Sequence, residues 1–162
     1  MADEKKSRYS IDSGALIHAW HRAYPPKNFA SFWGKMEGAI QEGLILASVE
    51  VFNEIKKKDD DLSDWCDRRP NSFFVEIDDE VQEHLAHIMG TYPRLVDTVK
   101  GRSGGDPFVI ALARSYNPSP LTVITQEGFG KKNSPKIPDV CNAEKIPCLN
   151  LVEFIQAEDW RF

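Results

Sequence analysis

The sequence has few cysteines and no long apolar run. Its three cysteines, Cys66, Cys141 and Cys148, form no C-x-x-C pair, which argues against a zinc site and for reduced thiols, although Cys141 and Cys148 are near enough in sequence to meet. No apolar segment approaches the roughly 20 residues of a membrane-spanning helix. The charged N-terminus also lacks the apolar core of a secretory signal. We therefore expect a cytoplasmic protein that makes no membrane contact.

Basic residues are scarcer than acidic ones. Lysine and arginine number 20 against 25 aspartates and glutamates, for a net charge of −5. This balance excludes a globally basic nucleic-acid-binding domain, although it leaves room for a local basic patch. The 162 residues, 41% of them hydrophobic, predict a flexible tail over residues 1–7 and a single domain over 8–162. Where the acids lie is then more informative than their number.

Short apolar runs alternate with helical patterns along the chain. Strands are expected at 8–12, 44–47, 73–77, 121–124 and 148–151. Between them, apolar spacing and capping residues predict helices near 15–23, 28–42, 48–58, 59–69, 78–88, from 106 onward, and at 152–157. Residues 90–105 and 126–138 are expected to be loops. This alternation predicts a three-layer α/β/α sandwich around a mainly parallel sheet.

Four acids stand at or near the ends of the predicted strands. Asp12 closes the first strand, Glu54 lies on the helix after the second, Asp106 opens a buried helix, and Glu127 follows the strand at 121–124. Parallel strands bring these positions to one edge, where converging carboxylates repel one another unless a cation neutralises them. Such oxygen ligands suit Mg²⁺ or Mn²⁺. Taken singly, each acid also fits an ordinary role as a helix-starting or solvated residue.

Four stretches of the chain resemble the PIN-domain nucleases. They are 9–17 (YSIDSGALI), 47–55 (ASVEVFNEI), 104–113 (GGDPFVIALA) and 123–129 (VITQEGF). The segment 136–141 (KIPDVC) is similar to a PIN-like subfamily of small bacterial proteins of unknown function linked to toxin–antitoxin loci. The resemblance implies an α/β/α sandwich and an endoribonuclease. It would use Mg²⁺ or Mn²⁺ and a metal-activated water to cleave single-stranded or structured RNA, as the toxin of a type II toxin–antitoxin module.

The resemblance also implies roles for individual residues. Asp12, Glu54 and Asp106 match the first three acids of the family's metal site, so with Glu127 they are the expected catalytic and metal-binding residues. Thr125 and Glu127 match a Thr-x-Asp element in which glutamate here replaces the usual aspartate. Ser13 matches a small hydroxyl residue after the first acid. Asp139 is either a further acid near the mouth of the site or an ordinary loop charge.

An acidic site needs basic groups around it to bind RNA. Lys131, Lys132 and Lys136 follow Glu127, and with Ser13 and Thr125 they are the predicted substrate-binding residues. The other basic groups are 56–58, 68–69, Lys100 and Arg102. All of these also fit solvated surface charges.

The partners implied are RNA, an antitoxin protein and a second copy of the chain in a homodimer. The histidine pairs His18/His21 and His84/His87 are expected on helix surfaces, and the tryptophans in the core or a dimer interface. The glutamate at position 127 leaves an alternative open: a catalytically weak PIN-like module that binds RNA or protein.

Overall fold

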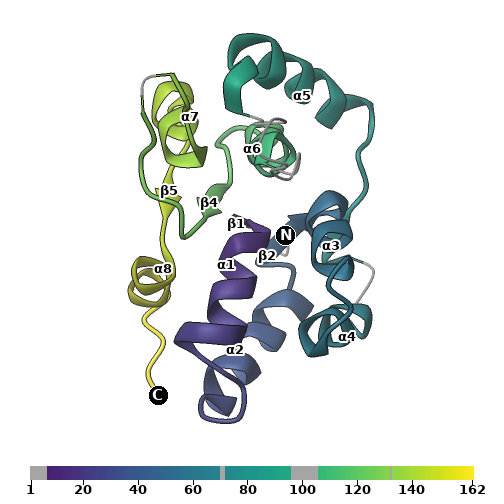
Figure 1. Cartoon of the computed structure of the whole chain (residues 1–162), viewed down its shortest axis with the longest axis vertical. Helices are drawn as coiled ribbons and strands as arrows, with labels where there is room; N and C mark the ends of the chain where they lie inside the picture. The colour runs from purple at the N-terminus through teal and green to yellow at the C-terminus, as the bar shows by residue number, and fades with distance from the viewer. Residues whose placement is uncertain (1–6, 70–71, 96–105, 132) are drawn as a thin grey trace.

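Five parallel strands form the centre of the molecule (Figure 1). The computed structural model describes residues 7–69, 72–95, 106–131 and 133–162. The sheet has the order β3-β2-β1-β4-β5. The strands are β1 (Tyr9–Ile11), β2 (Ile45–Ser48), β3 (Phe74–Val75), β4 (Thr122–Ile124) and β5 (Cys148–Leu149). The chain thus builds outward from β1 in one direction and then returns to build outward in the other.

Helices lie on both sides of this sheet (Figure 1). They are α1 (Ser13–His18), α2 (Ala30–Gln41), α3 (Val49–Lys56), α4 (Asp61–Asp67), α5 (Asp79–Thr91), α6 (Asp106–Arg114), α7 (Ile137–Glu144) and α8 (Leu151–Ala157). A π-helical turn, Ala19–Ala23, extends α1, and a 3-10 turn covers Pro93–Leu95. None of the helices described here combines the length and apolar character needed to cross a membrane.

The predicted α/β/α sandwich is confirmed, and its sheet is entirely parallel. Ser48 and Asp78 cap α3 and α5 as predicted, their side chains accepting hydrogen bonds from the Glu50 and Val81 amides. Two loop boundaries were wrong. The loop predicted at 126–138 ends at residue 136, because helix α7, which was not predicted, begins at Ile137. The predicted loop at 90–105 also starts late, since α5 runs through Thr91. Residues 1–6 of the tail predicted over 1–7, and residues 96–105, lie outside the described residues.

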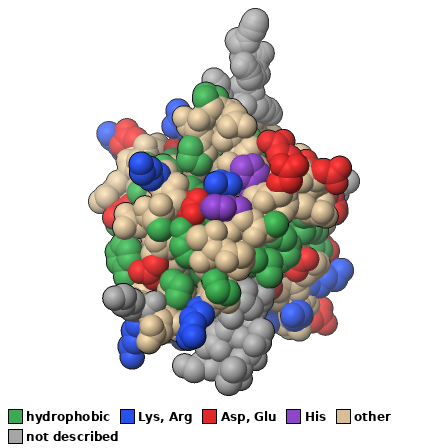
Figure 2. All heavy atoms as spheres, turned by 90° about the horizontal axis from the view of Figure 1, so that it is seen from above, with side chains coloured by type: hydrophobic (Ala, Val, Ile, Leu, Met, Phe, Trp, Pro, Cys, Tyr) green, Lys and Arg blue, Asp and Glu red, His purple; other side chains and the backbone are tan. Residues whose placement is uncertain are grey.

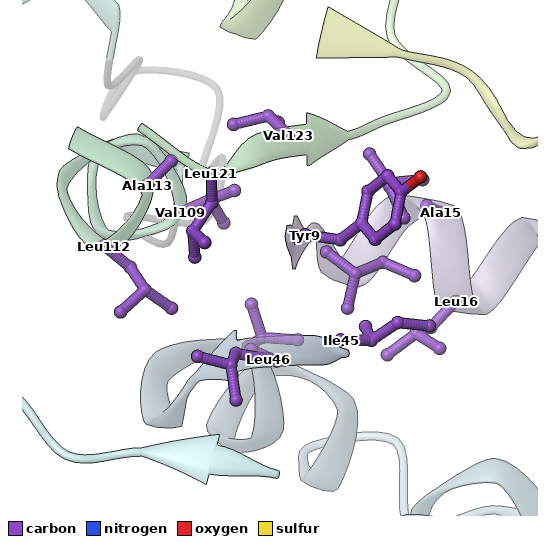
Figure 3. Close-up of a cluster of buried hydrophobic side chains, with 14 of the residues drawn as sticks. Tyr9, Ala15, Leu16, Ile45, Leu46, Val109, Leu112, Ala113, Leu121 and Val123 are labelled. Atoms are coloured by element: carbon purple, nitrogen blue, oxygen red, sulfur yellow. The ribbon is translucent and has the colours of Figure 1, made fainter. Parts of the chain in front are cut away.

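The central strand β1 faces two different layers. Tyr9 packs against Phe154 of α8, with ring centroids 4.9 Å apart. Ser10 faces the opposite way, and its hydroxyl donates to the Val109 carbonyl of α6 at 3.0 Å. Its register partners, Leu46 and Val123, lie on the same face of the sheet. Figure 3 shows apolar side chains of α6, β2 and β4 meeting there. The small serine at the centre lets α6 approach the sheet closely.

Of the four tryptophans, Trp33 and Trp65 are buried in the core, as predicted, and Trp20 and Trp160 are half-buried against it. Trp33 packs edge-on against both Trp20 and Trp65, with ring centroids 4.9 and 5.0 Å away. Trp160 packs on Phe154 in the same manner. The three cysteines are free thiols, and the side chains of Cys141 and Cys148 do meet, in a hydrogen bond. The aromatic cluster secures the α1, α2 and α4 side of the sheet.

A polar network ties α5, α6 and α7 together. Glu144 accepts hydrogen bonds from Arg114 Nε at 2.9 Å and from the Tyr92 hydroxyl at 2.6 Å, and lies 3.1 Å from His87 Nε2. Arg114 also contacts His84 at 2.8 Å. Figure 2 shows histidine side chains gathered beside a basic one on this end of the molecule. Burial acts to raise the pKa of Glu144, but the bonds from Tyr92, His87 and Arg114 outweigh it and hold the pKa below its usual value.

Replacing Glu144 should therefore weaken the fold in a pH-dependent way. We expect Glu144→Gln to lower the free energy of unfolding at neutral pH by about 1–3 kcal/mol, since charge-assisted hydrogen bonds are lost. A carboxylate with a depressed native pKa stabilises the fold above its unfolded pKa, and this contribution disappears as the pH falls through the native value. The gap between variant and parent should then close below about pH 4. Urea unfolding at several pH values measures it.

The matched control is Glu83→Gln, on the exposed surface of α5. It should leave the free energy of unfolding within about 0.5 kcal/mol of the parent. Equal effects of the two variants, or a gap that stays constant with pH, would contradict the role given to Glu144.

Candidate functional site

The site begins where β1 and β4 end side by side. Their register pairs Ile11 with Ile124, so the next residues, Asp12 and Thr125, emerge together at the carboxyl edge of the sheet. The Thr125 hydroxyl donates to Asp12 Oδ2 at 2.9 Å. Both side chains are buried, at 4% and 2% exposure. This is the point where the strand order reverses direction, the usual position of ligand sites in open parallel sheets.

The buried Asp12 carboxylate is electrostatically unfavourable. Its pKa is raised to about 7: burial is the largest cause, the negative charges of Glu127 and Glu54 add to the rise, and hydrogen bonds from Thr125 and the Gly14 amide act against it. A side-chain carbon at position 14 would lie 3.3 Å from Asp12 Oδ2, so the glycine leaves that side of the carboxylate open. Such a group is stabilised by any cation that reaches it.

The other acids come to the same edge by separate routes. Ser48 starts α3 directly after β2, which positions Glu54 opposite α1, where the Ser13 hydroxyl donates to Glu54 Oε1 at 2.5 Å. Asp106 opens α6. Because α6 leads into the start of β4, it runs against the strands and its N-terminus lies at their carboxyl edge. The topology thus brings acids that are far apart in the sequence to the same edge of the sheet.

A single cleft of about 410 Å³ collects all four predicted acids. Its lining residues are Asp12, Ser13, Gly14, His18, Glu54, Asp106, Gln126, Glu127 and Lys136. Carboxylate oxygens are suitable ligands for Mg²⁺ or Mn²⁺, so the donor set fits such an ion chemically. In the described part of the chain, however, no three His, Cys, Asp or Glu side chains are already grouped as a metal site.

Two acidic side chains, Glu127 and Asp139, hold the loop after β4 in place. Glu127 Oε1 accepts from the Ile137 amide at the start of α7, at 3.1 Å. Asp139 Oδ2 accepts from the amides of Gly130 and Lys136, at 2.7 and 2.8 Å. Asp139 therefore supports the loop and does not line the acidic cleft. A side chain at Gly130 would lie 2.3 Å from the Ser134 carbonyl oxygen, so the tight loop requires glycine there.

Few of the predicted basic groups reach the cleft. Lys136 is half-buried in its wall, whereas Lys131 is exposed on the loop and bridges to Ser134. Arg69 is engaged elsewhere, in an ion pair with Glu37 at 3.1 Å and stacked over the Trp65 ring. Residues 56–58 are exposed at the end of α3. Lys100, Arg102 and Lys132 lie outside the described residues.

The structure adds three residues to the cleft that sequence reasoning did not place there. Gly14 and His18 both lie on α1, two and six residues after Asp12, and Gln126 precedes Glu127. Gln126 also accepts a hydrogen bond from the Leu151 amide at 2.7 Å, which joins the cleft to the start of α8. The available signal was position: Gly14 and His18 are four residues apart and so lie on one face of α1, and Gln126 is the direct neighbour of Glu127.

The strain at Asp12 predicts a stabilising substitution. A carboxyl group whose pKa is higher in the native than in the unfolded state destabilises the fold once it is ionised. Its effect on the free energy of unfolding therefore becomes more unfavourable as the pH rises from about 4 to 7. In the presence of a chelator at pH 8, we expect Asp12→Asn to raise the free energy of unfolding by more than about 1.4 kcal/mol, the equivalent of one pKa unit. The amide oxygen still accepts from Thr125. Urea unfolding against pH provides the measurement.

Asp64→Asn, on the exposed surface of α4, is the matched control and should change the free energy of unfolding little at any pH measured. If Asp12→Asn were instead less stable than the parent at pH 8, the carboxylate would not be the strained group described above.

Comparison with curated proteins found no significant match in sequence. Among solved structures, the chain is similar to VapBC2 from Rickettsia felis bound to a DNA fragment from its promoter, with a TM-score of 0.54 and 12% identity over 88% of this chain and 97% of that one. This likeness shows the fold, which is PIN-like as the sequence resemblance implies. The model of one family, described as a domain of unknown function (DUF4411), matches residues 9–162, and the chain belongs to that family.

Proposed function

We propose that this protein is a divalent-metal-dependent endoribonuclease acting at the acidic cleft. The observation that carries the proposal is the convergence of Asp12, Glu54, Asp106 and Glu127 from four separate segments onto one cleft. The buried Asp12 lies at its base with a raised pKa. A fold that maintains such a cluster bears a cost in stability, which function most readily explains. The PIN-like fold supports the same reading.

These four acids would hold Mg²⁺ or Mn²⁺. When bound, such an ion lowers the pKa of a coordinated water and offsets the negative charge that develops on a phosphodiester. The protein's own groups orient the acids: Thr125 fixes one oxygen of Asp12, and Ser13 fixes one oxygen of Glu54. Both hydroxyls donate to carboxylates, so their role is to position acids, with Ser13 also in the cleft wall.

The substrate we propose is single-stranded or structured RNA. Lys136 lies in the cleft wall and supplies a positive charge beside the acids, where a phosphate would need one. Lys131 is exposed on the same loop and extends this role along the RNA strand. Lys132 stays a predicted substrate-binding residue. The negative charge of the cleft predicts that RNA binds weakly when no divalent cation is present.

We further propose that the enzyme is the toxin of a type II toxin–antitoxin module in the cytoplasm. The similarity in fold to VapBC2, solved with promoter DNA, supports this assignment. Its antitoxin would cover the acidic cleft and present basic groups to it. A homodimer of the toxin is part of the same proposal.

Single-charge substitutions test the nuclease. We expect the parent to cleave single-stranded RNA with Mg²⁺ or Mn²⁺ and to stop when EDTA is added. Asp12→Asn and Asp106→Asn should lower the cleavage rate at least about 100-fold, because each removes a charged ligand. Mn²⁺ should also raise the melting temperature of the parent and not that of Asp12→Asn. Rates come from a fluorescent oligoribonucleotide, and the Asp64→Asn control should match the parent in both assays.

The same experiment separates the two candidate functions. A parent protein that binds RNA in Mn²⁺ and leaves it uncut would be the PIN-like binding module. Cleavage that survives Asp12→Asn or Asp106→Asn at the parental rate would mean that the active site lies elsewhere.

A further inference from the structure

A second cavity adjoins the acidic cleft and shares Glu127 with it. It has a volume of about 420 Å³, within the range of about 300–1,000 Å³ usual for small-molecule sites. Thr125 and Glu127 after β4, and Leu149 and Asn150 at the end of β5, form its base. The cavity therefore lies at the same carboxyl edge of the sheet as the acids, one strand farther out.

The lining of this cavity suits a flat group with apolar faces and polar edges. Ile146, Pro147 and Leu149 supply apolar walls, while Asn142 and Glu153 supply polar groups. Two reciprocal hydrogen bonds fix Asn150 and Glu153. The side chain of each residue accepts from the backbone amide of the other, at 2.9 Å. Proteins recognise unpaired RNA bases by packing against the face of the base and forming hydrogen bonds to its edge, and this lining offers groups for both.

The charges of the cavity indicate which part of a nucleotide enters. Among the described residues that line it, none is lysine, arginine or histidine, and Glu127 and Glu153 are both acidic. A phosphate is therefore unsuited to this cavity and belongs on the other side of Glu127, where Lys136 lines the acidic cleft. A neutral base with N–H donors on its edge suits the acceptors here.

An exposed aromatic ring borders the same cavity. Phe129 is 72% exposed, more than any other large hydrophobic residue in the described chain, and it belongs to the cavity lining. The loop that carries it is anchored on both sides, by the Glu127 bond to Ile137 and by the Gly130 bond to Asp139. The structure thus presents an unshielded ring from a fixed position. Such rings stack on single-stranded bases.

We propose that this cavity is a base-binding subsite: it receives a nucleobase of a single-stranded RNA, next to the phosphodiester that lies at the acidic cleft. Phe129 stacks on the base, and Asn142, Asn150 and Glu153 accept or donate hydrogen bonds at its edge. The subsite rests on RNA being the substrate proposed above. It adds a recognition element to the cleavage site, and it predicts that a free strand is preferred over a duplex, because a paired base is not available to enter the cavity.

A thermodynamic cycle tests the subsite without any cleavage. The probes are an eight-nucleotide RNA and eight versions of it, each with one abasic position, titrated in Ca²⁺ and followed by fluorescence anisotropy. We expect Phe129→Ala to weaken binding of the intact RNA about 5- to 100-fold, and to weaken one abasic version less than 2-fold. Phe129→Trp should restore the affinity. Phe162→Ala, at another exposed phenylalanine, is the control and should match the parent.

The proposal is overturned if Phe129→Ala acts equally on the intact RNA and on every abasic version, or on none of them. It is also overturned if Phe129→Ala changes the oligomeric state in sedimentation and leaves RNA affinity unchanged, since a second copy of the chain would then occupy the cavity. Coupling between Phe129 and one base in a protein that never cuts RNA in Mn²⁺ would support the subsite and refute the nuclease. Cleavage of RNA in Mn²⁺ without coupling between Phe129 and any base would support the nuclease and refute the subsite.

Discussion

The hydrogen bond between Thr125 and Asp12 is the contact on which the rest of the site depends. It joins the ends of the two strands at which the sheet changes direction, and it holds a carboxylate that is almost completely buried. Neither side chain has freedom to move without disturbing β1, β4 or the start of α1. The carboxylate lines the acidic cleft with only 4% of the residue exposed, so little water reaches it to stabilise its charge. Strain of this kind is maintained where a function needs it.

The acidic cleft shows that acids at one edge serve different purposes. Asp139 and Glu127 both accept backbone amides at the start of α7, and these bonds give the loop between them its shape. Glu127 also borders both cavities, so the same side chain holds the loop in place and lies in the proposed active site. The loop in turn places Lys136 on the acidic side and Phe129 on the other. A phosphate and its neighbouring base could each find a complementary surface on the two sides of Glu127.

Sequence reasoning reached the fold because its signals were periodic. Apolar runs marked β2 and β4, the second of them rich in β-branched residues, and Ser48 and Asp78 marked the starts of α3 and α5. Helix α7 was missed because only half of its residues are buried and the preceding segment is polar. The signal was a proline and an acid at positions 138 and 139, which are typical of a first helical turn.

The candidate site could be predicted in its residues but not in its contacts. Asp12, Glu54, Asp106 and Glu127 follow from their order relative to the strands, and the structure does bring them to one cleft. The bond from Ser13 to Glu54 depends on how α1 packs against α3, and the role of Asp139 depends on the path of an aperiodic loop. No spacing rule encodes either of these. Only the packed chain shows that Thr125 is turned inward toward Asp12 and that Phe129 is turned outward.

The scarcity of basic residues has a consequence for how this protein would bind RNA. Proteins that rely on phosphate contacts from many lysines and arginines lose affinity steeply as salt rises. Lys136 is the one lysine or arginine among the described residues of the cleft, and the neighbouring cavity has none among its described lining. In the proposed complex, binding energy would then come from direct coordination to a cation held by the acids and from stacking of a base, both of which need direct contact. The net charge of −5 is compatible with the proposed RNA substrate for this reason: recognition would be confined to one edge that carries a cation, and the rest of the surface would repel RNA and so disfavour unproductive binding.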